Sequence, residues 1–455
     1  MLFVLTEDQG AHTRFLGTPG LRTPHMDSLA KSGTYFKNAF VAYPVCSASK
    51  AAFYTGLHSH TNGILNNTHN YHKPAERVTE EERNRRLAII NRVRDEFVTM
   101  TEILKRNGYY QGVTHKLHVY PNEKFPYDEF LHGRRAELSG FLNRAKKRGQ
   151  PWFLMVNIAN SHRPYPNSDK KSIRVSPTDV ELPKYLPDSP VIRKDWAEYL
   201  AAIEETDALT GEAIDVLDQS GQRENTIIVF MSDHGPTFQH GKMTLYDLGL
   251  RVPLSFSGPG IKKGQVSDAL ISELDLLPTL VDLCQLESPI DYPLHGQSMA
   301  AVLRGQPNEN PREYVFAEIS NLGPLPNDGI QERSVFDGRW KLIYRENVEK
   351  KWRQVNADSR QFKTWGNRTY AETIRLKDKF PRQFQILVEM DPQNFDASVP
   401  PLELYDLASD PDEMNNLASD ERFAKNLARL QNALVQWCKA TDDSSLRLHQ
   451  EIATP

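Results

Sequence analysis

The chain has 455 residues, of which 39% are hydrophobic and 25% are charged, with a formal net charge of −4. This length exceeds what one compact core usually holds, so we expect two packed units. The small negative charge offers phosphate groups no attractive field and argues against a nucleic-acid partner. No apolar stretch is long enough for membrane insertion.

The first two-thirds of the chain alternate strand-like and helix-like segments. Short apolar runs predict buried strands, and apolar residues at helical spacing predict helices. Glycines at positions 33 and 108 end two of the shorter helices. This alternation predicts an α/β fold with a largely parallel sheet. The predicted strands are 2–5, 109–114, 152–158 and 226–231, and the predicted helices are 26–31, 101–108 and 196–217.

Acids and a histidine follow the carboxyl ends of the first and last of these strands. Glu7 and Asp8 come after residues 2–5, and Asp233 and His234 come after residues 226–231. Open α/β sheets bind ligands at this edge, and carboxylate oxygens suit a calcium ion. Taken alone, such pairs are more often turn residues at strand ends.

The pattern changes from about residue 307 onward. Two alternating segments flank Asp337-Gly338 and predict a hairpin over 331–344, followed by a strand at 403–407 and an amphipathic helix over 423–437. We therefore expect an α/β domain over 1–306 and a smaller antiparallel domain with a closing helix over 307–455. The densely charged segment 76–95 is predicted to be a solvated helix rather than a substrate-binding insertion.

Cys46, one of only three cysteines, begins the most informative run of the chain, Cys-Ser-Ala-Ser-Lys-Ala-Ala-Phe-Tyr-Thr-Gly. Small hydroxyl residues followed by a helical stretch place the sulfur at a helix N-terminus. The unpaired amides there favour an anionic nucleophile or a bound anion. Lys50 lies one turn further along the same helix face. Without other information, a buried structural cysteine is the commoner interpretation.

The run 46–56 resembles the signature of the type I sulfatases, which reads Cys or Ser, any residue, Pro or Ala, Ser, Arg, and ends in Thr-Gly. Other segments match that family in the same order along the chain. They lie at residues 1–10, 23–33, 115–118, 160–164, 232–235, 241–242, 251–253, 275–279 and 403–417.

This resemblance implies an alkaline phosphatase-like fold, in which helices sandwich a large, mostly parallel mixed sheet and a smaller antiparallel sheet with a helix follows. It also implies that a maturase, either a formylglycine-generating or a radical enzyme, oxidises Cys46 to formylglycine. The hydrated aldehyde then attacks the sulfur atom of the substrate. One calcium ion is implied, with ligands at the positions that match the family: Glu7, Asp8, Asp233 and His234.

The resemblance assigns roles to the remaining polar residues of the predicted pocket. Three cations, Lys50, Lys116 and Lys242, are implied to contact sulfate oxygens. His118 matches the family base that regenerates the aldehyde, and His162 matches a general acid near the leaving group. The family has arginine where this chain has Lys50, which keeps the charge but loses the bidentate fork.

Within the family, residues 116–128 and 403–423 look closest to heparan N-sulfatase (sulfamidase) and its bacterial relatives, some of which act on algal polysaccharides such as ulvan. The implied substrate is a sulfated carbohydrate carrying an N-sulfate or an O-sulfate. The residues expected to contact the sugar are His69, Asn70, Tyr71, His72 and Arg163.

Two other functions stay open at this point. Related folds hydrolyse phosphomonoesters or phosphonates at the same metal, and a relative in which Lys50 prevents maturation would bind carbohydrate without catalysis. Met1 begins directly in a predicted strand, and polysaccharide sulfatases are usually exported. Either a signal peptide preceded this sequence or the protein is intracellular, and we expect the first, with a periplasmic or secreted location.

Overall fold

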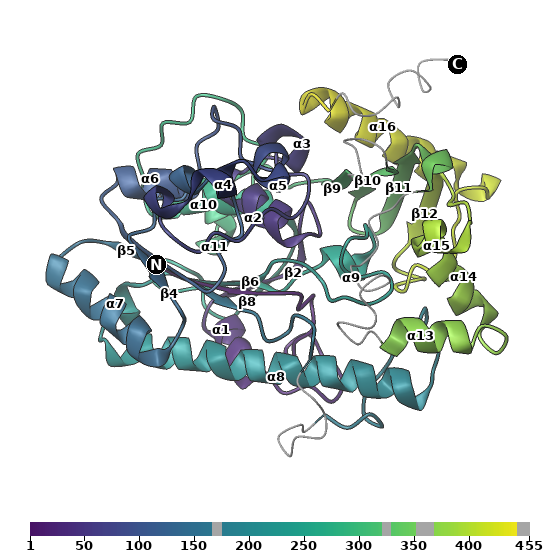
Figure 1. Ribbon diagram of the computed structural model, residues 1–455, viewed down its shortest axis with the longest axis horizontal. Coiled ribbons are helices and arrows are strands. Elements are labelled where there is room, and N and C mark those ends of the chain that lie inside the picture. The colour runs from purple at the N-terminus through teal and green to yellow at the C-terminus, as the bar shows by residue number, and fades with distance from the viewer. Residues whose placement is uncertain (166–174, 321–328, 352–367, 444–455) are drawn as a thin grey trace.

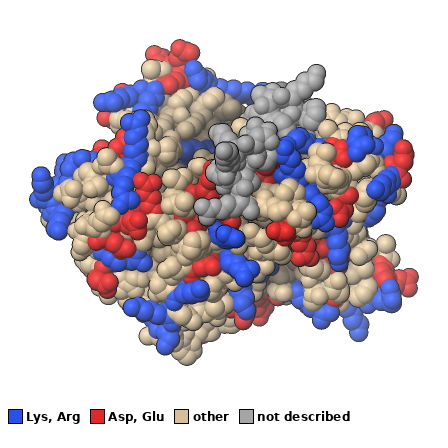
Figure 2. Space-filling view, turned by 90° about the horizontal axis from the view of Figure 1, so that it is seen from below, with Lys and Arg blue, Asp and Glu red and all other residues tan. Residues whose placement is uncertain are grey.

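The computed structural model describes residues 1–165, 175–320, 329–351 and 368–443. Two sheets organise the described chain (Figure 1). The larger has eight strands in the order β4-β3-β5-β1-β6-β7-β2-β8, and the smaller has four in the order β12-β11-β10-β9. Positive and negative side chains are interspersed over the described part of the face in Figure 2, in keeping with the small net charge.

The centre of the large sheet is parallel, as predicted. β1 (Leu2–Thr6) pairs in parallel with β5 (Trp152–Ile158) on one side and with β6 (Ile228–Ser232) on the other. Every residue of these three strands is buried, which explains why they read as continuous apolar runs. The other strands are β2 (Thr34–Phe40), β3 (Tyr110–Thr114), β4 (Glu129–Leu131), β7 (Leu254–Ser257), which is antiparallel to β2 and β6, and β8 (Gln265–Ser272).

Helices cover both faces of this sheet (Figure 1). Alternate residues of β1 point to opposite faces. Phe3 and Leu5 share a core with residues of α2 (Cys46–Thr55), α6 (Met100–Arg106) and α10 (Leu276–Leu283). Leu2 and Val4 share the other core with residues of α1 (Pro24–Ser32), α7 (Arg135–Arg148) and α8 (Pro190–Gln219).

The smaller sheet is antiparallel and confirms the predicted hairpin. Its strands are β9 (Val315–Ser320), β10 (Gln331–Phe336), β11 (Trp340–Glu346) and β12 (Leu402–Asp406). The closing helix α16 (Ala424–Ala440) packs Leu430 and Leu434 against Val335 and Leu342. The boundary at residue 306 stays a prediction.

The remaining helical segments are short, except α13 (Arg368–Arg375) and α14 (Pro381–Met390). The others are α3 (Ser59–Asn62), η1 (Ala75–Arg77), α4 (Glu80–Arg83), α5 (Arg86–Ile90), η2 (Asn122–Lys124), η3 (Arg223–Asn225), α9 (Asp247–Leu250), η4 (Glu273–Asp275), α11 (Ala300–Leu303), η5 (Val348–Lys350), α15 (Pro392–Phe395) and η6 (Glu421–Phe423).

Two predictions about helices were wrong in part. The charged segment 76–95 is not one helix but η1, α4 and α5, because Thr79 caps a new helix start and Asn84 ends that helix after one turn. The long helix α8 begins before residue 196, because Ser189 caps it and Pro190 occupies its first position. No helix among the described residues has the length and apolar character needed to cross a bilayer.

Candidate active site

The carboxyl ends of β1, β3, β5 and β6 bring the predicted site residues together. The ends of β1 and β6 are joined by a hydrogen bond from the Asp8 amide to Asp233 Oδ1 at 2.9 Å. Asp8 adopts a left-handed backbone conformation with φ of 53°, a strained state for a residue with a side chain. The residues joined here by direct contacts are Glu7, Asp8, Cys46, Lys50, Lys116, His162, Asp233, His234 and Lys242. His118 acts on the same thiol electrostatically.

Cys46 is the first residue of α2, as the sequence predicted. Its Sγ lies 3.3 Å from His234 Nε2 and 3.4 Å from Lys242 Nζ. Burial opposes ionisation of the thiol, but the positive charges of Lys116, Lys242 and His234 outweigh burial and lower the pKa of Cys46 well below its usual value. The pocket around this sulfur therefore favours an anion.

Lys50 does not point at the thiol. Its Nζ donates to Glu7 Oε1 at 2.8 Å, to Asn157 Oδ1 at 3.2 Å and to the Lys116 carbonyl at 3.2 Å. The side chain is fully buried. The prediction that Lys50 presents its charge to sulfate does not match this geometry, because Glu7 and Asn157 hold the ammonium.

Glu7 is held by two lysines, since Lys116 Nζ lies 2.5 Å from its Oε2. Burial opposes ionisation of Glu7, but Lys116 and Lys50 hold the pKa of this carboxyl well below its usual value. Glu7 lies outside the group of possible metal ligands in the described chain, so the prediction that it binds the metal is not supported by this geometry.

The group that could hold a metal comprises Asp8, Cys46, Asp233 and His234, whose ligand atoms lie within 4.8 Å of one another. Asp233 Oδ2 is buried and has no hydrogen-bond partner among the described residues, with His234 Nε2 3.6 Å away. Burial raises the pKa of Asp233 well above its usual value, despite the favourable charge of His234, and the negative charges of Glu7, Cys46 and Asp8 add to this effect. An orphaned buried carboxylate oxygen among acidic neighbours fits a divalent cation.

Lys242 and Thr237 hold the other carboxylate of this group. Lys242 Nζ donates to Asp8 Oδ1 at 2.9 Å, and the Thr237 hydroxyl donates to Asp8 Oδ2 at 3.0 Å. Burial works against the charged amine, but Asp8 and Cys46 outweigh it and raise the pKa of Lys242. Lys242 therefore stays a cation beside the sulfur.

Two histidines complete the pocket. His118 helps to lower the pKa of Cys46, and its backbone amide donates to Asn70 Oδ1 at 3.0 Å. Burial and the charge of Lys116 lower the pKa of His118, which favours its neutral imidazole. His162 Nε2 lies 3.4 Å from Lys242 Nζ and 3.9 Å from Asp8 Oδ2.

The residues expected to contact the sugar have other partners. His72 Nε2 lies 3.0 Å from the Leu131 carbonyl, and the Tyr71 hydroxyl donates to the Glu82 carbonyl at 2.8 Å. Arg163 is only 4% exposed and donates from both terminal nitrogens to Asp195. We therefore do not retain Arg163 as a sugar contact, because burial and the ion pair with Asp195 turn its guanidinium away from a ligand.

Sequence reasoning missed Asn157, Thr237 and Glu273. Asn157 interrupts the apolar run of β5, and a polar residue in a fully buried strand was a usable signal. Glu273 is buried beneath α2, where it accepts from the Ser49 hydroxyl at 2.7 Å and from the Ala42 amide at 2.7 Å. No local pattern revealed Glu273, because its partners lie more than 220 residues away.

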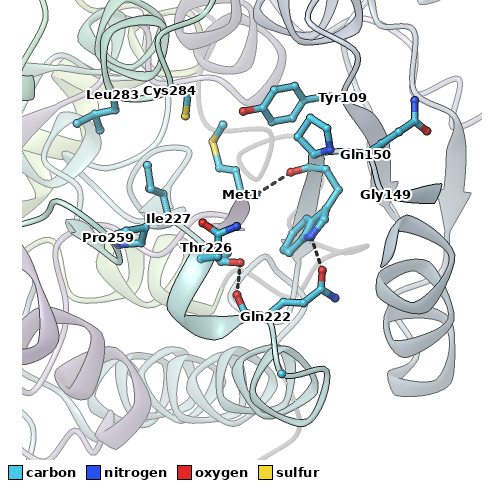
Figure 3. A pocket seen from close by; sticks show the side chains of 14 residues that line it. Met1, Tyr109, Gly149, Gln150, Gln222, Thr226, Ile227, Pro259, Leu283 and Cys284 are labelled. Atoms are coloured by element: carbon cyan, nitrogen blue, oxygen red, sulfur yellow. Dashed lines mark hydrogen bonds between the residues drawn. The ribbon is translucent and has the colours of Figure 1, made fainter. Parts of the chain in front are cut away.

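A separate pocket of about 610 Å³ lies at the opposite edge of the sheet, at the amino ends of β1 and β5 (Figure 3). Its lining includes Met1, Tyr109, Gln222 and Cys284, and the Trp152 indole donates to Gln222 Oε1 at 3.0 Å. None of the predicted site residues lines this pocket. The candidate active site therefore belongs to the carboxyl edge alone.

The eight-stranded mixed sheet has the alkaline phosphatase-like fold, and a buried thiol lies among acids, lysines and histidines at its carboxyl edge. The profile of the sulfatase family matches residues 1–137 and 135–286, and a second profile, described as N-sulphoglucosamine sulphohydrolase, C-terminal, matches residues 235–380. The chain belongs to the sulfatase family and is a sulfuric ester hydrolase.

Similar proteins agree with this assignment. The chain is 27% identical to human N-sulphoglucosamine sulphohydrolase, over 97% of this chain and 90% of that protein. It is 28% identical to an ulvan-active sulfatase of Formosa agariphila, over 98% of this chain and 75% of that protein.

Solved structures show the same fold. A protein of glycosaminoglycan metabolism from Bacteroides thetaiotaomicron superposes with a TM-score of 0.72 at 16% identity, covering 97% of this chain and 96% of its own. A phosphonate monoester hydrolase from Silicibacter pomeroyi superposes with a TM-score of 0.67 at 18% identity, covering 98% of this chain and 96% of its own. At these identities the likeness concerns the fold.

Proposed function

We propose that this enzyme hydrolyses sulfate esters or sulfamates of sulfated carbohydrates, with residue 46 as the nucleophile after conversion to formylglycine. One observation carries the proposal. The Cys46 sulfur lies at the start of α2, within 3.4 Å of both Lys242 and His234, in the pocket that also holds Asp8 and Asp233.

The substrate class follows from the names of similar proteins. One acts on N-sulphoglucosamine and another on ulvan, so we propose a glycosaminoglycan or algal polysaccharide fragment. We also propose that the enzyme acts in the periplasm or outside the cell, where enzymes that degrade sulfated polysaccharides usually work. We retain the division into a catalytic domain over 1–306 and a second domain over 307–455.

We propose that one calcium ion is held by Asp8, Asp233 and His234. These residues supply carboxylate oxygens and one imidazole nitrogen within reach of residue 46. The ion would supply positive charge next to the sulfate oxygens. Glu7 would instead hold the buried Lys50, and its other oxygen would orient Lys116, whose side chain is partly exposed.

Formylglycine, when a maturase has formed it from Cys46, supplies a hydroxyl nucleophile for the sulfur atom. Lys242 and Lys116 would bind the sulfate oxygens as point charges, which stabilises the charge that develops in the transition state. His118, whose lowered pKa favours the neutral imidazole, would accept the proton of the second hydroxyl. His162, on the other side of Lys242, would protonate the leaving oxygen or nitrogen.

The test combines maturation and turnover. Mass spectrometry of the peptide that contains residue 46, from protein made in its own host, should show the mass change of an aldehyde replacing the thiol. The same protein should release sulfate from defined sulfated disaccharides, and Cys46→Ala should release none. Aryl phosphate and aryl phosphonate are the comparison substrates. An unmodified thiol with no turnover would support carbohydrate binding alone, and faster turnover of phosphonate would support the other hydrolase class.

A further inference from the structure

We infer that Asp195 is a positioning residue for His162, which it holds through Arg163 so that His162 Nε2 faces the reacting atoms. The inference rests on the proposed function, because it assigns His162 the leaving-group proton. Asp195 lies on α8, outside every motif that the sequence analysis found. It touches neither the thiol nor the possible metal ligands in the contacts of the described residues.

Arg163 is fixed on several sides. Its two terminal nitrogens donate to the two oxygens of Asp195 at 2.9 and 2.8 Å, a bidentate arrangement between two buried groups. Its Nε donates to the Thr237 carbonyl at 3.3 Å. Its guanidinium lies 4.4 Å from the centre of the Tyr165 ring and 4.7 Å from that of Phe238. These contacts fix the Arg163 side chain and so restrain the backbone that carries it.

That backbone sets the tautomer of the adjacent histidine. His162 Nδ1 lies 2.6 Å from the Arg163 carbonyl oxygen, which only accepts hydrogen bonds, so Nδ1 carries the proton. The proton that His162 can give or take is then the one on Nε2. This atom faces Lys242 Nζ at 3.4 Å and Asp8 Oδ2 at 3.9 Å. His162 is 22% exposed, so a leaving group can reach it from solvent.

Residues of α13, in the C-terminal part of the chain, also contact the Asp195 carboxylate. The Thr369 hydroxyl, on α13, donates to Asp195 Oδ2 at 2.6 Å. Arg368 lies 3.6 Å from Asp195 Oδ1 and is itself paired with Glu198. Asp195 thus joins α8, the loop that carries His162, and α13. Through it, residues near 369 influence a group some 200 positions earlier in the chain.

The test compares aryl sulfates whose leaving phenols differ in basicity. A poor leaving group needs its proton in the transition state, whereas 4-nitrophenolate leaves without one. Asp195→Asn should lower kcat/KM for phenyl sulfate by about 10- to 100-fold, in the range of general acid catalysis, and for 4-nitrophenyl sulfate by less than about threefold. Thr369→Val should also lower kcat/KM for phenyl sulfate more than for 4-nitrophenyl sulfate, but by a smaller factor. This variant replaces Asp195→Asn in the test if Asp195→Asn does not fold.

Asp443→Asn is the matched control, because Arg333 and Asp443 form another buried bidentate pair with no contact to His162. It should lower both rates by the same factor. A second readout is independent of activity. In protein labelled with ¹⁵N-histidine, with His162→Gln for assignment, the wild-type signal should show protonated Nδ1, and Asp195→Asn should show both tautomers.

Equal loss on both aryl sulfates, or an unchanged tautomer in Asp195→Asn, would overturn the inference. A wild-type enzyme inactive on every sulfate would refute the proposed function instead, while the tautomer measurement would still decide the role of Asp195.

Discussion

The ammonium of Lys50 lies 2.8 Å from the carboxylate of Glu7, and both side chains are fully buried. Lys116 approaches the other oxygen of the same carboxylate. One carboxylate therefore balances two cations from α2 and the loop after β3. This arrangement separates two groups of charges: Glu7 with Lys50 and Lys116, and Asp8 and Asp233 near the thiol.

Glu7→Gln should destabilise the protein strongly, because it leaves two lysines without their common counter-ion. Removing one partner of a buried ion pair costs about 3–5 kcal/mol in free energy of unfolding. Urea unfolding without added calcium measures the change. Glu123→Gln is the control, since its partner Arg83 and Glu123 itself are 36% and 47% exposed, and it should cost less than about 1 kcal/mol. Equal costs for the two variants would show that the Glu7 pair is unimportant.

Calcium should stabilise the wild-type protein, and Asp233→Asn should abolish that effect. The Asp233 side chain offers a buried oxygen that accepts no hydrogen bond within the described part of the chain, and an amide cannot replace it as a charged ligand. At a calcium concentration of 100 Kd the free energy of unfolding should rise by about 2.7 kcal/mol. Thermal unfolding with and without calcium measures it. Glu7→Gln should keep the calcium response, and if it lost the response as completely as Asp233→Asn, Glu7 would be a ligand.

The strand ends show what the sequence could predict. Glu7, Asp8, Asp233 and His234 follow apolar runs, and parallel pairing of β1 with β6 necessarily brings such ends together. The position of Cys46 at a helix start also followed from local pattern. These features depend on neighbours in the chain or on one simple pairing rule.

The direction of long side chains was beyond the sequence. Lys50 lies one turn from Cys46, yet Glu7 and Asn157, on other strands, decide where its ammonium points. Arg163 adjoins His162, but its partner Asp195 is 32 residues further on, just before the predicted start of the long helix. Such pairs depend on tertiary packing that no periodicity encodes.

Glu413 should make stability fall as pH rises. Burial, with the nearby Asp247 carboxylate, raises the pKa of Glu413 to about 7, although Lys341 lies 2.9 Å away and opposes the rise. Between the unfolded value near 4.5 and about pH 7, the folded state keeps a proton that the unfolded state releases. Ionisation of Glu413 therefore lowers the free energy of unfolding by up to about 3 kcal/mol as pH rises through that window.

The check is urea unfolding at pH 5 and pH 7 for the wild type and Glu413→Gln. The amide cannot ionise, so this variant should lose less stability between the two pH values than the wild type. Glu421→Gln, at an exposed position, should behave as the wild type does. Parallel stability curves for the wild type and Glu413→Gln would show that Glu413 does not titrate in this range.

Glu273 should tolerate an amide but not truncation. Burial raises the pKa of Glu273 well above its usual value, against the hydrogen bonds from Ser49 and the Ala42 amide, so the carboxyl favours its neutral form. Glu273→Gln keeps the shape and one acceptor oxygen and should change the free energy of unfolding by less than about 1.5 kcal/mol. Glu273→Ala leaves Ser49 and the Ala42 amide unpaired beneath α2 and should cost about 2–5 kcal/mol in free energy of unfolding.

Because Ser49 lies one turn from residue 46, the alanine variant should also lose turnover that the glutamine variant keeps, as sulfate release from the same substrate would show. Loss of turnover in both variants would mean that the charge of Glu273, and not its shape, supports the nucleophile.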